Sequence, residues 1–251
     1  MKEVARITVF WRGVLTLTAI PLLTIIISLA AAGLAVTRGC ADGRLQFLAR
    51  WWGRMICRLA GVRPQVSGLE NIAAARPYIF VANHQSQFDI FVLQGYFAHD
   101  FRWLAKKELF RIPLWGWAMR RAGHIAVDRG HGRQALVSLG EAAQRIAAGT
   151  SVVIFPEGTR SPDGRLQPFK AGGMVLAIKS GIEVVPVAIA GTREVLPKGS
   201  LLPRPGPVEI KIGQPVATAD YHLKQKQELA GLLEERVRQL LAPPANAPHG
   251  P

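Results

Sequence analysis

YIFVANHQSQFD, residues 78–89, joins an apolar run directly to a polar segment. Its first part, YIFVAN (78–83), is an apolar run of strand length, which is typical of a strand buried on both faces. His84 follows the strand directly, and Asp89 comes five positions later. Polar side chains placed where a buried strand ends are expected to line a ligand crevice, because ligands bind at the carboxyl ends of parallel strands.

Downstream of this stretch, short apolar runs alternate with longer helical patterns. Further strands are expected at 101–109, 124–128, 151–156, 184–190 and 208–216, and helices at 133–148, 171–181 and 221–241. Pro186 lies inside one of these runs and predicts an edge strand or a bulge. The alternation predicts an α/β domain over residues 63–241, with a mostly parallel central sheet flanked by helices. The Pro- and Ala-rich residues 242–251 predict a disordered tail.

The N-terminal part of the chain has a different character. No residue between Arg12 and Arg38 is charged, and about 20 apolar residues suffice to cross the hydrocarbon core of a bilayer. The run is too long for the apolar part of a signal peptide and lacks the polar face of a core helix. Residues 44–60 then combine apolar positions at helical spacing with arginines, as amphipathic helices at lipid surfaces do.

We therefore expect residues 1–62 to form membrane-anchoring helices. Two arrangements fit the sequence: one spanning helix, or a helical hairpin that dips into one leaflet. Arginines dominate the C-terminal flank of the apolar run, so a spanning helix would place the rest of the chain on the cytoplasmic face of the inner (cytoplasmic) membrane.

The chain is strongly basic, with a formal net charge of +14. Such a charge favours nucleic acid, anionic lipid or phosphorylated substrates as partners. No nucleic-acid-binding motif is present, and the aromatic residues cluster with the apolar N-terminus, so we expect no nucleic acid partner. The two cysteines, Cys40 and Cys57, do not amount to a disulfide framework.

His84 and Asp89 are the candidate catalytic residues. On a continuous helix their spacing would separate them by about 140°, so they meet only if His84 lies in a turn and Asp89 in the first helical turn. The carboxylate would then orient the imidazole and leave its second nitrogen free to take a proton. A structural pair that caps a helix fits the same spacing. Ser86 is nearby, but the chain has no GxSxG nucleophile motif.

A second motif, FPEGTRS (155–161), follows another predicted strand. Gly158 permits a sharp turn, and Glu157 and Arg160 would point into the same crevice as His84 if both strands are central. Arg160 offers a planar fork that suits phosphate. A surface ion pair between Glu157 and Arg160 is the alternative interpretation.

A third segment, GHIAVDR (123–129), offers Arg129 as a further anion ligand, while Lys106 and Lys107 add positive charge upstream. The adjoining GHGRQA (130–135) fits the dinucleotide-binding pattern G-x-G-x-x-A. Charged residues stand just before its first glycine, however, and the preceding strand is short. A nucleotide-dependent oxidoreductase is therefore disfavoured.

Taken together, these segments resemble the glycerolipid acyltransferase family, which carries four ordered sequence blocks. NHQSQFD resembles the first block, GHIAVDR the second, FPEGTRS the third, and VVPVAIAG (184–191) the fourth. H-x4-D alone is a weak signal, but H-x4-D followed about 70 residues later by FPEGTRS is specific. The match in order and spacing extends over about residues 77–190.

The resemblance implies that His84 is a base and Asp89 its orienting partner. It also implies that Pro186 shapes an acyl site. The residues that it implies for the glycerol phosphate region are Lys106, Arg129, Glu157, Gly158 and Arg160. No metal and no cofactor are implied.

The activity that this resemblance implies is transfer of a fatty acyl group from acyl-CoA or acyl-carrier protein to 1-acyl-glycerol-3-phosphate, giving phosphatidate for phospholipid biosynthesis. The expected partners are therefore the lipid acceptor, the anionic membrane surface and the thioester donor. Because arginine suits a carboxylate as well as a phosphate, another lysolipid is the alternative acceptor, such as lyso-ornithine lipid or lysophosphatidylglycerol.

Two segments outside the motifs stay open. PLWGWAM (113–119) carries Trp115 and Trp117, which either line an acyl path or belong to the core. LPRPGP (202–207) fits none of the four blocks.

Overall fold

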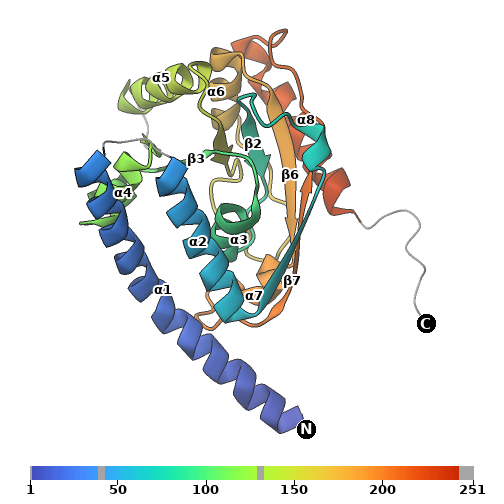
Figure 1. Cartoon of the computed structure of the whole chain (residues 1–251). Coiled ribbons are helices and arrows are strands. Elements are labelled where there is room, and N and C mark those ends of the chain that lie inside the picture. Colours follow the sequence, from blue (N-terminus) through green and yellow to red (C-terminus); the bar gives the residue numbers. More distant parts are fainter. Residues whose placement is uncertain (1, 39–42, 129–132, 243–251) are drawn as a thin grey trace.

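Seven strands form one sheet in the computed structural model, which describes residues 2–38, 43–128 and 133–242 (Figure 1). The strands are β1 (Val62–Ser67), β2 (Ile79–Ala82), β3 (Arg102–Lys106), β4 (Ile125–Val127), β5 (Val152–Ile154), β6 (Val184–Ala190) and β7 (Gly206–Ile212). The helices are α1 (Lys2–Arg38), α2 (Gly43–Ala60), α3 (Phe88–Tyr96), α4 (Trp115–Arg121), α5 (Arg133–Ala147), α6 (Gly172–Ser180), α7 (Thr192–Val195) and α8 (Lys226–Leu241). Short 3-10 helices lie at Leu69–Asn71, Lys107–Arg111 and Leu223–Gln225.

The strand order in the sheet is β1-β7-β6-β2-β5-β3-β4. All neighbouring pairs are parallel except β6 and β7, which run antiparallel. The prediction of an α/β fold with a mostly parallel central sheet is confirmed. This topology brings the carboxyl ends of β2, β3 and β5 together, and each of these strands leads into one of the predicted site segments.

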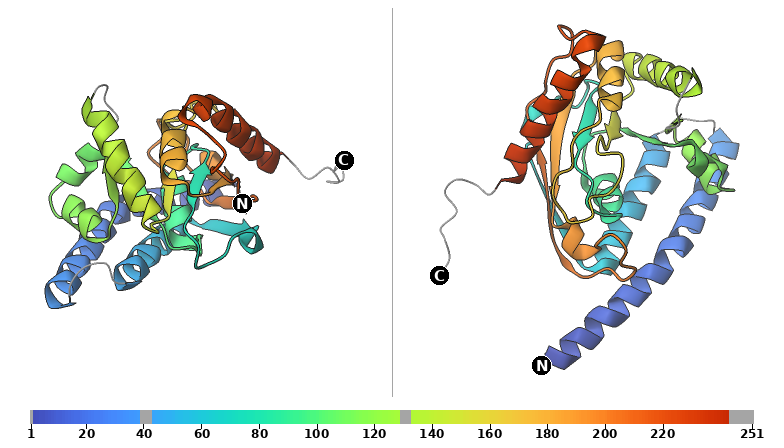
Figure 2. Two further views of the ribbon diagram at one scale, coloured as in Figure 1. Left: turned by 90° about the horizontal axis from the view of Figure 1, so that it is seen from above. Right: turned by 180° about the vertical axis from the view of Figure 1, so that it is seen from behind.

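Helices cover both faces of the sheet (Figure 2). Phe80 and Ala82 of β2 belong to a core cluster with α2 and α3, whereas Ile79 and Val81 belong to a second cluster with α5, α6 and α8. Because β2 is buried on both faces, its sequence is a continuous apolar run rather than an alternating one. Burying each such side chain contributes about 1.5–3 kcal/mol.

β6 lies in the interior of the sheet, so of the two expectations for Pro186 the edge strand is wrong. Val184 pairs with Val216, and Val187 pairs with Ile212 of β7. Between these two pairs β6 advances by three residues, whereas the segment opposite it advances by four. This extra residue is a bulge. The Val184 backbone N–H donates to the carbonyl oxygen of Val216, on the β7 side of the strand. Because backbone direction alternates along a strand, the nitrogen of Pro186 points to the same side and meets the bulge, where no N–H donor is needed.

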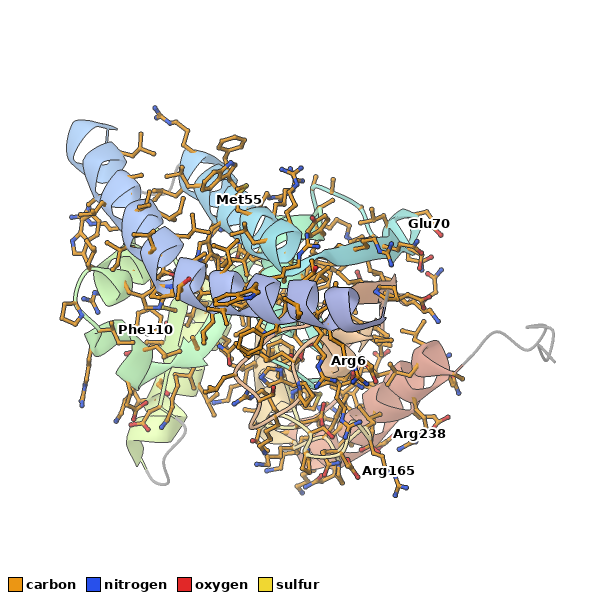
Figure 3. The ribbon with its side chains drawn as sticks, turned by 90° about the horizontal axis from the view of Figure 1, so that it is seen from below. Arg6, Met55, Glu70, Phe110, Arg165 and Arg238 are labelled. Carbon is orange, nitrogen blue, oxygen red and sulfur yellow. The ribbon has the colours of Figure 1, made fainter. Side chains whose placement is uncertain are left out.

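The two N-terminal helices run side by side along one flank of the domain (Figure 3). Trp52, Ile56 and Cys57 of α2 belong to the main core cluster, so α2 is packed as part of the core of the α/β domain. Burial raises the pKa of the Cys57 thiol to about 12. Cys40 and most of the predicted tail, residues 243–251, lie outside the described residues.

The 29 residues Arg6–Leu34 of α1 are long and apolar enough to cross a membrane. One side of α1 packs on the domain through Ile27 and Ala31. Large apolar side chains on the other side of α1, among them Trp11 and Leu15, are exposed along the length of the helix. α1 is therefore anchored to the fold on one side and presents an apolar surface on the other.

Candidate active site

His84 and Asp89 form the centre of the site. β2 ends at Ala82, and Asp89 lies in the first turn of α3, which is the arrangement that brings the two side chains together. His84 Nδ1 lies 2.8 Å from Asp89 Oδ2. The same carboxylate oxygen accepts the backbone N–H groups of Gln85 at 2.7 Å and Ser86 at 2.9 Å. The fully buried carboxylate thus fixes the turn and the imidazole at once.

The second imidazole nitrogen of His84, Nε2, makes no hydrogen bond to any described residue. The ring stacks on Phe155 with 4.1 Å between ring centroids and 13° between planes. Since Phe155 comes directly after β5, two neighbouring strands hold the imidazole from two directions. His84 is therefore oriented with one nitrogen available for proton transfer.

Glu157 has a different place from the one that the resemblance implies. Its Oε1 accepts the backbone N–H of His84 at 2.6 Å, and its Oε2 accepts that of Gln167 at 3.0 Å. Burial raises the pKa of this carboxyl group, and the two backbone hydrogen bonds oppose the rise. This carboxyl group is 2% exposed and accepts from two backbone amides, so it holds the His84 loop in position.

The Ser161 backbone N–H donates to the carbonyl oxygen of His84 at 2.8 Å. The FPEGTRS loop is therefore hydrogen-bonded to His84 through Glu157 on one side and Ser161 on the other. Together these contacts explain why the two motifs, about 70 residues apart in sequence, form one structural unit.

Gly158 lies beside the imidazole and has a left-handed φ of 78°. A Cβ at this position would come within 2.9 Å of Lys170 Nζ. Glycine therefore permits the turn and leaves room for the ammonium group. Sequence reasoning missed Lys170, because it lies beyond the motif and comes next to Gly158 only through the fold of the loop.

Two of the predicted cationic residues, Lys106 and Arg160, line the same cavity as His84. The Lys106 ammonium is 58% exposed and lies 3.7 Å from a Glu108 carboxylate oxygen, a pair that contributes little in water. Within the described residues, the Arg160 guanidinium has no carboxylate partner, so the alternative of a Glu157–Arg160 ion pair does not form. Positive charge is thus available in the cavity that His84 lines.

Two other residues that the sequence singled out, Lys107 and Pro186, do not line this cavity. Lys107 pairs with Asp128. Pro186 is buried on the face of the sheet that packs on α8, where it lies close to Gly213 and Leu240. Arg129, part of the GHIAVDR segment, lies outside the described residues.

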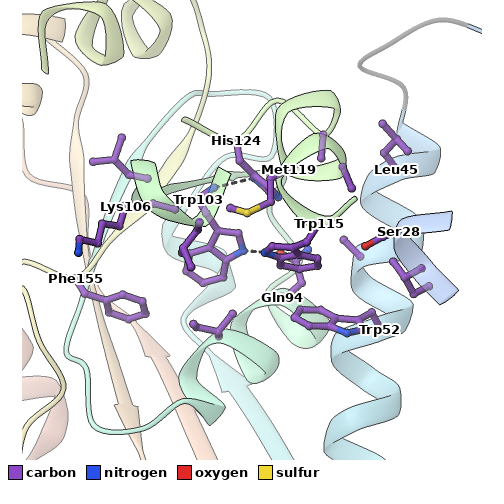
Figure 4. Close-up of a pocket in the computed structure, with 18 of the residues that line it drawn as sticks. Ser28, Leu45, Trp52, Gln94, Trp103, Lys106, Trp115, Met119, His124 and Phe155 are labelled. Atoms are coloured by element: carbon purple, nitrogen blue, oxygen red, sulfur yellow. Dashed lines mark hydrogen bonds between the residues drawn. The ribbon is translucent and has the colours of Figure 1, made fainter. Parts of the chain in front are cut away.

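The cavity extends from His84 into the domain and has a volume of about 350 Å³ (Figure 4). Its walls come from α1, α2, α3, α4 and β3, and include Ile27, Ala31, Leu45, Leu48, Trp52, Ile90, Trp103, Leu109, Trp115, Ala118 and Met119. Trp115 lines the cavity, whereas Trp117 packs against the small cluster of Ala31, Leu45 and Ala118. Trp115 also packs against the main core cluster, so this residue combines the two expected roles.

The polar groups deep in the cavity are neutral and paired. Gln94 Oε1 accepts the indole N–H of Trp103 at 2.7 Å, and the Trp103 backbone N–H donates to His124 Nδ1 at 3.1 Å. Burial lowers the pKa of His124 to about 3, so this ring is uncharged at neutral pH. Cations at the opening and an apolar interior suit a ligand with an anionic head and an alkyl chain.

Residues 63–190 match the family model described as acyltransferase. The chain belongs to this acyltransferase family. The match covers β2 to β6, the His84–Asp89 pair and the FPEGTRS loop, whereas β7 lies beyond it.

Among its relatives, the chain is 35% identical over 175 residues to a 1-acyl-sn-glycerol-3-phosphate acyltransferase of Pseudomonas aeruginosa, covering 68% of this chain and 67% of that one. It is 37% identical over 155 residues to a chloroplastic 1-acyl-sn-glycerol-3-phosphate acyltransferase of Brassica napus. That match covers 61% of this chain, and the chain spans 44% of the length of the Brassica relative.

Among solved structures, the crystal structure of PlsC, the 1-acyl-sn-glycerophosphate acyltransferase of Thermotoga maritima, is similar over nearly the whole length. The TM-score is 0.69 at 28% identity, covering 90% of this chain and 98% of that one. The likeness extends to the N-terminal helices, because 90% coverage cannot be reached from residues 63–251 alone.

Proposed function

We propose that the protein transfers a fatty acyl group from a thioester donor to the free hydroxyl of 1-acyl-glycerol-3-phosphate, giving phosphatidate. The observation that carries this proposal is the Asp89-oriented imidazole of His84 at the opening of a cavity with cations outside and apolar walls inside. Relatives that are named for this reaction support the choice of acceptor.

The reaction needs one base and no covalent enzyme intermediate. His84 Nε2 takes the proton of the acceptor hydroxyl as its oxygen attacks the thioester carbonyl. The carbon–sulfur bond then breaks, and the thiolate takes the proton back from the imidazolium. Asp89 stabilises the transient imidazolium through Nδ1, and general-base assistance of this kind is worth about 10²–10⁴-fold in rate. No metal or cofactor takes part, and the donor is acyl-CoA or acyl-carrier protein.

Lys106, Arg160 and Lys170 bind the acceptor phosphate in this proposal. Lys106 and Arg160 line the cavity that contains His84, and Lys170 lies next to Gly158 of the same lining. Arg160 provides the planar fork that pairs with two phosphate oxygens. Glu157 holds the loop that carries His84 and makes no contact with the lipid.

The protein is associated with the membrane through α1 and α2, and we place the catalytic domain on the cytoplasmic face of the inner membrane. Of the two arrangements, the hairpin in one leaflet is favoured. The C-terminal half of α1 packs on the domain through Ile27 and Ala31. If α1 spanned the bilayer, the part of the domain that packs on α1 would also have to lie within the bilayer. The exposed apolar side of α1 instead suits an interfacial position.

An acyl-transfer assay with the purified protein tests this function. Lysophosphatidate, lyso-ornithine lipid and lysophosphatidylglycerol serve as acceptors, each with acyl-CoA and with acyl-carrier protein as donor. We expect phosphatidate as the main product. Acylation of another lysolipid with none of lysophosphatidate would overturn the proposed acceptor and retain the chemistry.

A further inference from the structure

A second hollow lies away from the catalytic cavity, where α1 passes the end of α2. Its volume is about 490 Å³, and it is lined by Arg12, Arg58, Gly61, Val62, Arg63 and Pro205. Three of these six residues are arginines, and they come from α1, α2 and β1. The hollow shares no lining residue with the catalytic cavity.

Arg12 is held in place by the end of α2. Its Nε donates to the carbonyl oxygen of Leu59 at 2.8 Å, and its Nη2 donates to that of Arg58 at 3.3 Å. Gly61 has a φ of 74°, and a Cβ there would lie 2.9 Å from both Arg12 Cζ and the Pro205 Cβ. Glycine is thus the residue that leaves space for both the Arg12 guanidinium and the hollow.

The positive charge of this hollow is not neutralised by the protein. Arg12, Arg58 and Arg63 are all exposed, and within the described residues none of them pairs with a carboxylate. Three uncompensated guanidinium groups around one hollow attract a multivalent anion, and the planar guanidinium fork suits the oxygens of a phosphate.

The hollow opens next to the apolar surface of the N-terminal helices. Trp11, the neighbour of Arg12 on α1, is 62% exposed. On α2, Phe47, Trp51 and Arg58 follow one another at helical spacing and are all exposed, so Arg58 ends the same face that carries the aromatic rings. A cation at the end of such a face lies at the depth of lipid headgroups.

The LPRPGP segment, which fits none of the four sequence blocks, completes this hollow. Pro205 forms part of its wall, and Leu202 and Pro203 lie against Gly13 of α1. Leu201, just before the segment, is 71% exposed. The segment therefore joins the domain to α1 and extends the apolar surface beside the arginines.

We propose that this hollow binds the phosphate of an anionic phospholipid headgroup and so fixes the protein on the membrane. The inference rests on the membrane association in the proposed function, and it concerns a different site from the one that binds the acceptor. Exposed apolar side chains on both helices beside the arginines favour a lipid over a soluble phosphate, because only a lipid brings an apolar phase next to its phosphate.

The test is vesicle binding by the double variant Arg58→Gln/Arg63→Gln, which leaves Arg12 on the end of α2. Vesicles of phosphatidylcholine are compared with vesicles that also contain phosphatidylglycerol. Each basic residue near an anionic surface is worth about fivefold in binding, so we expect about 30-fold weaker partitioning onto the phosphatidylglycerol vesicles. Binding to pure phosphatidylcholine vesicles should stay as in the parent.

The matched control is Lys179→Gln/Arg236→Gln, which changes the net charge equally at exposed positions of α6 and α8. The control should bind as the parent does. Equal weakening by both double variants, or parent-like binding by Arg58→Gln/Arg63→Gln, overturns the proposal. Acyl transfer in detergent micelles should be unchanged by either variant, and this readout separates the lipid site from the proposed activity.

Discussion

At the scale of single residues, the site assigns a distinct task to each charged group near His84. Asp89 orients the imidazole, and Glu157 holds the backbone of the same loop. The two carboxylates look equivalent in the sequence because each follows a buried strand by a few residues. The structure separates them: one accepts from the imidazole and the other from backbone amides.

Arg160→Ala tests the cationic residues beside the imidazole. We expect the KM for lysophosphatidate to rise about 10- to 100-fold, since a charge-assisted hydrogen bond contributes about 1.5–3 kcal/mol. Steady-state kinetics with varied acceptor and saturating donor measure this rise. Arg165→Ala is the control on the same loop, because Arg165 is exposed next to Asp163 and does not line the cavity. Equal kinetics for Arg160→Ala and the parent would remove Arg160 from the site.

At the scale of elements, the position of α2 depends on close packing against α3. A Cβ at Gly53 would lie 2.7 Å from backbone atoms of Gly95 and Phe91, and one at Gly95 would lie 2.8 Å from the Arg54 nitrogen. The two helices therefore approach through glycines, and this approach places Leu48 and Trp52 in the cavity wall.

Gly53→Ala should lower the free energy of unfolding by about 1–3 kcal/mol, because the added methyl group overpacks a rigid backbone contact. Gly140→Ala is the matched control, as Gly140 lies in α5 with nothing within 4 Å of an added Cβ. That change should raise stability by about 0.5–1 kcal/mol. Thermal unfolding in detergent compares the two, and a Gly53→Ala variant as stable as the parent would contradict the proposed packing.

Six of the seven strands overlap ranges that the sequence predicted, including the half-exposed β7, and β1 was missed. β2, β5 and β6 are continuous apolar runs, and all three were expected. β1, Val62–Ser67, was missed, since VRPQVS is an exposed edge strand with a proline and no apolar run. Part of 101–109, expected as a strand, forms the 3-10 helix Lys107–Arg111 instead.

At the scale of the whole molecule, the site combines the short His84–Asp89 motif with a cavity whose walls come from distant parts of the sequence. The His84–Asp89 pair was predictable, because five residues between a strand and a helix determine its geometry. The cavity was not, because α1, α2, α4 and β3 supply its walls from distant parts of the sequence. The position of Lys170 and the arginine-lined hollow likewise depend on how loops and helices pack against one another. A local sequence pattern cannot predict such packing.

The central claim is that His84 is the base, and the most direct test is the turnover number of purified His84→Ala with lysophosphatidate and a thioester donor. His222→Ala, a change at an exposed histidine ahead of α8, serves as the control. We predict a loss of at least 100-fold for His84→Ala, with unfolding temperature and vesicle binding as in the parent. Turnover at the parent's rate in His84→Ala would show that His84 is not the base.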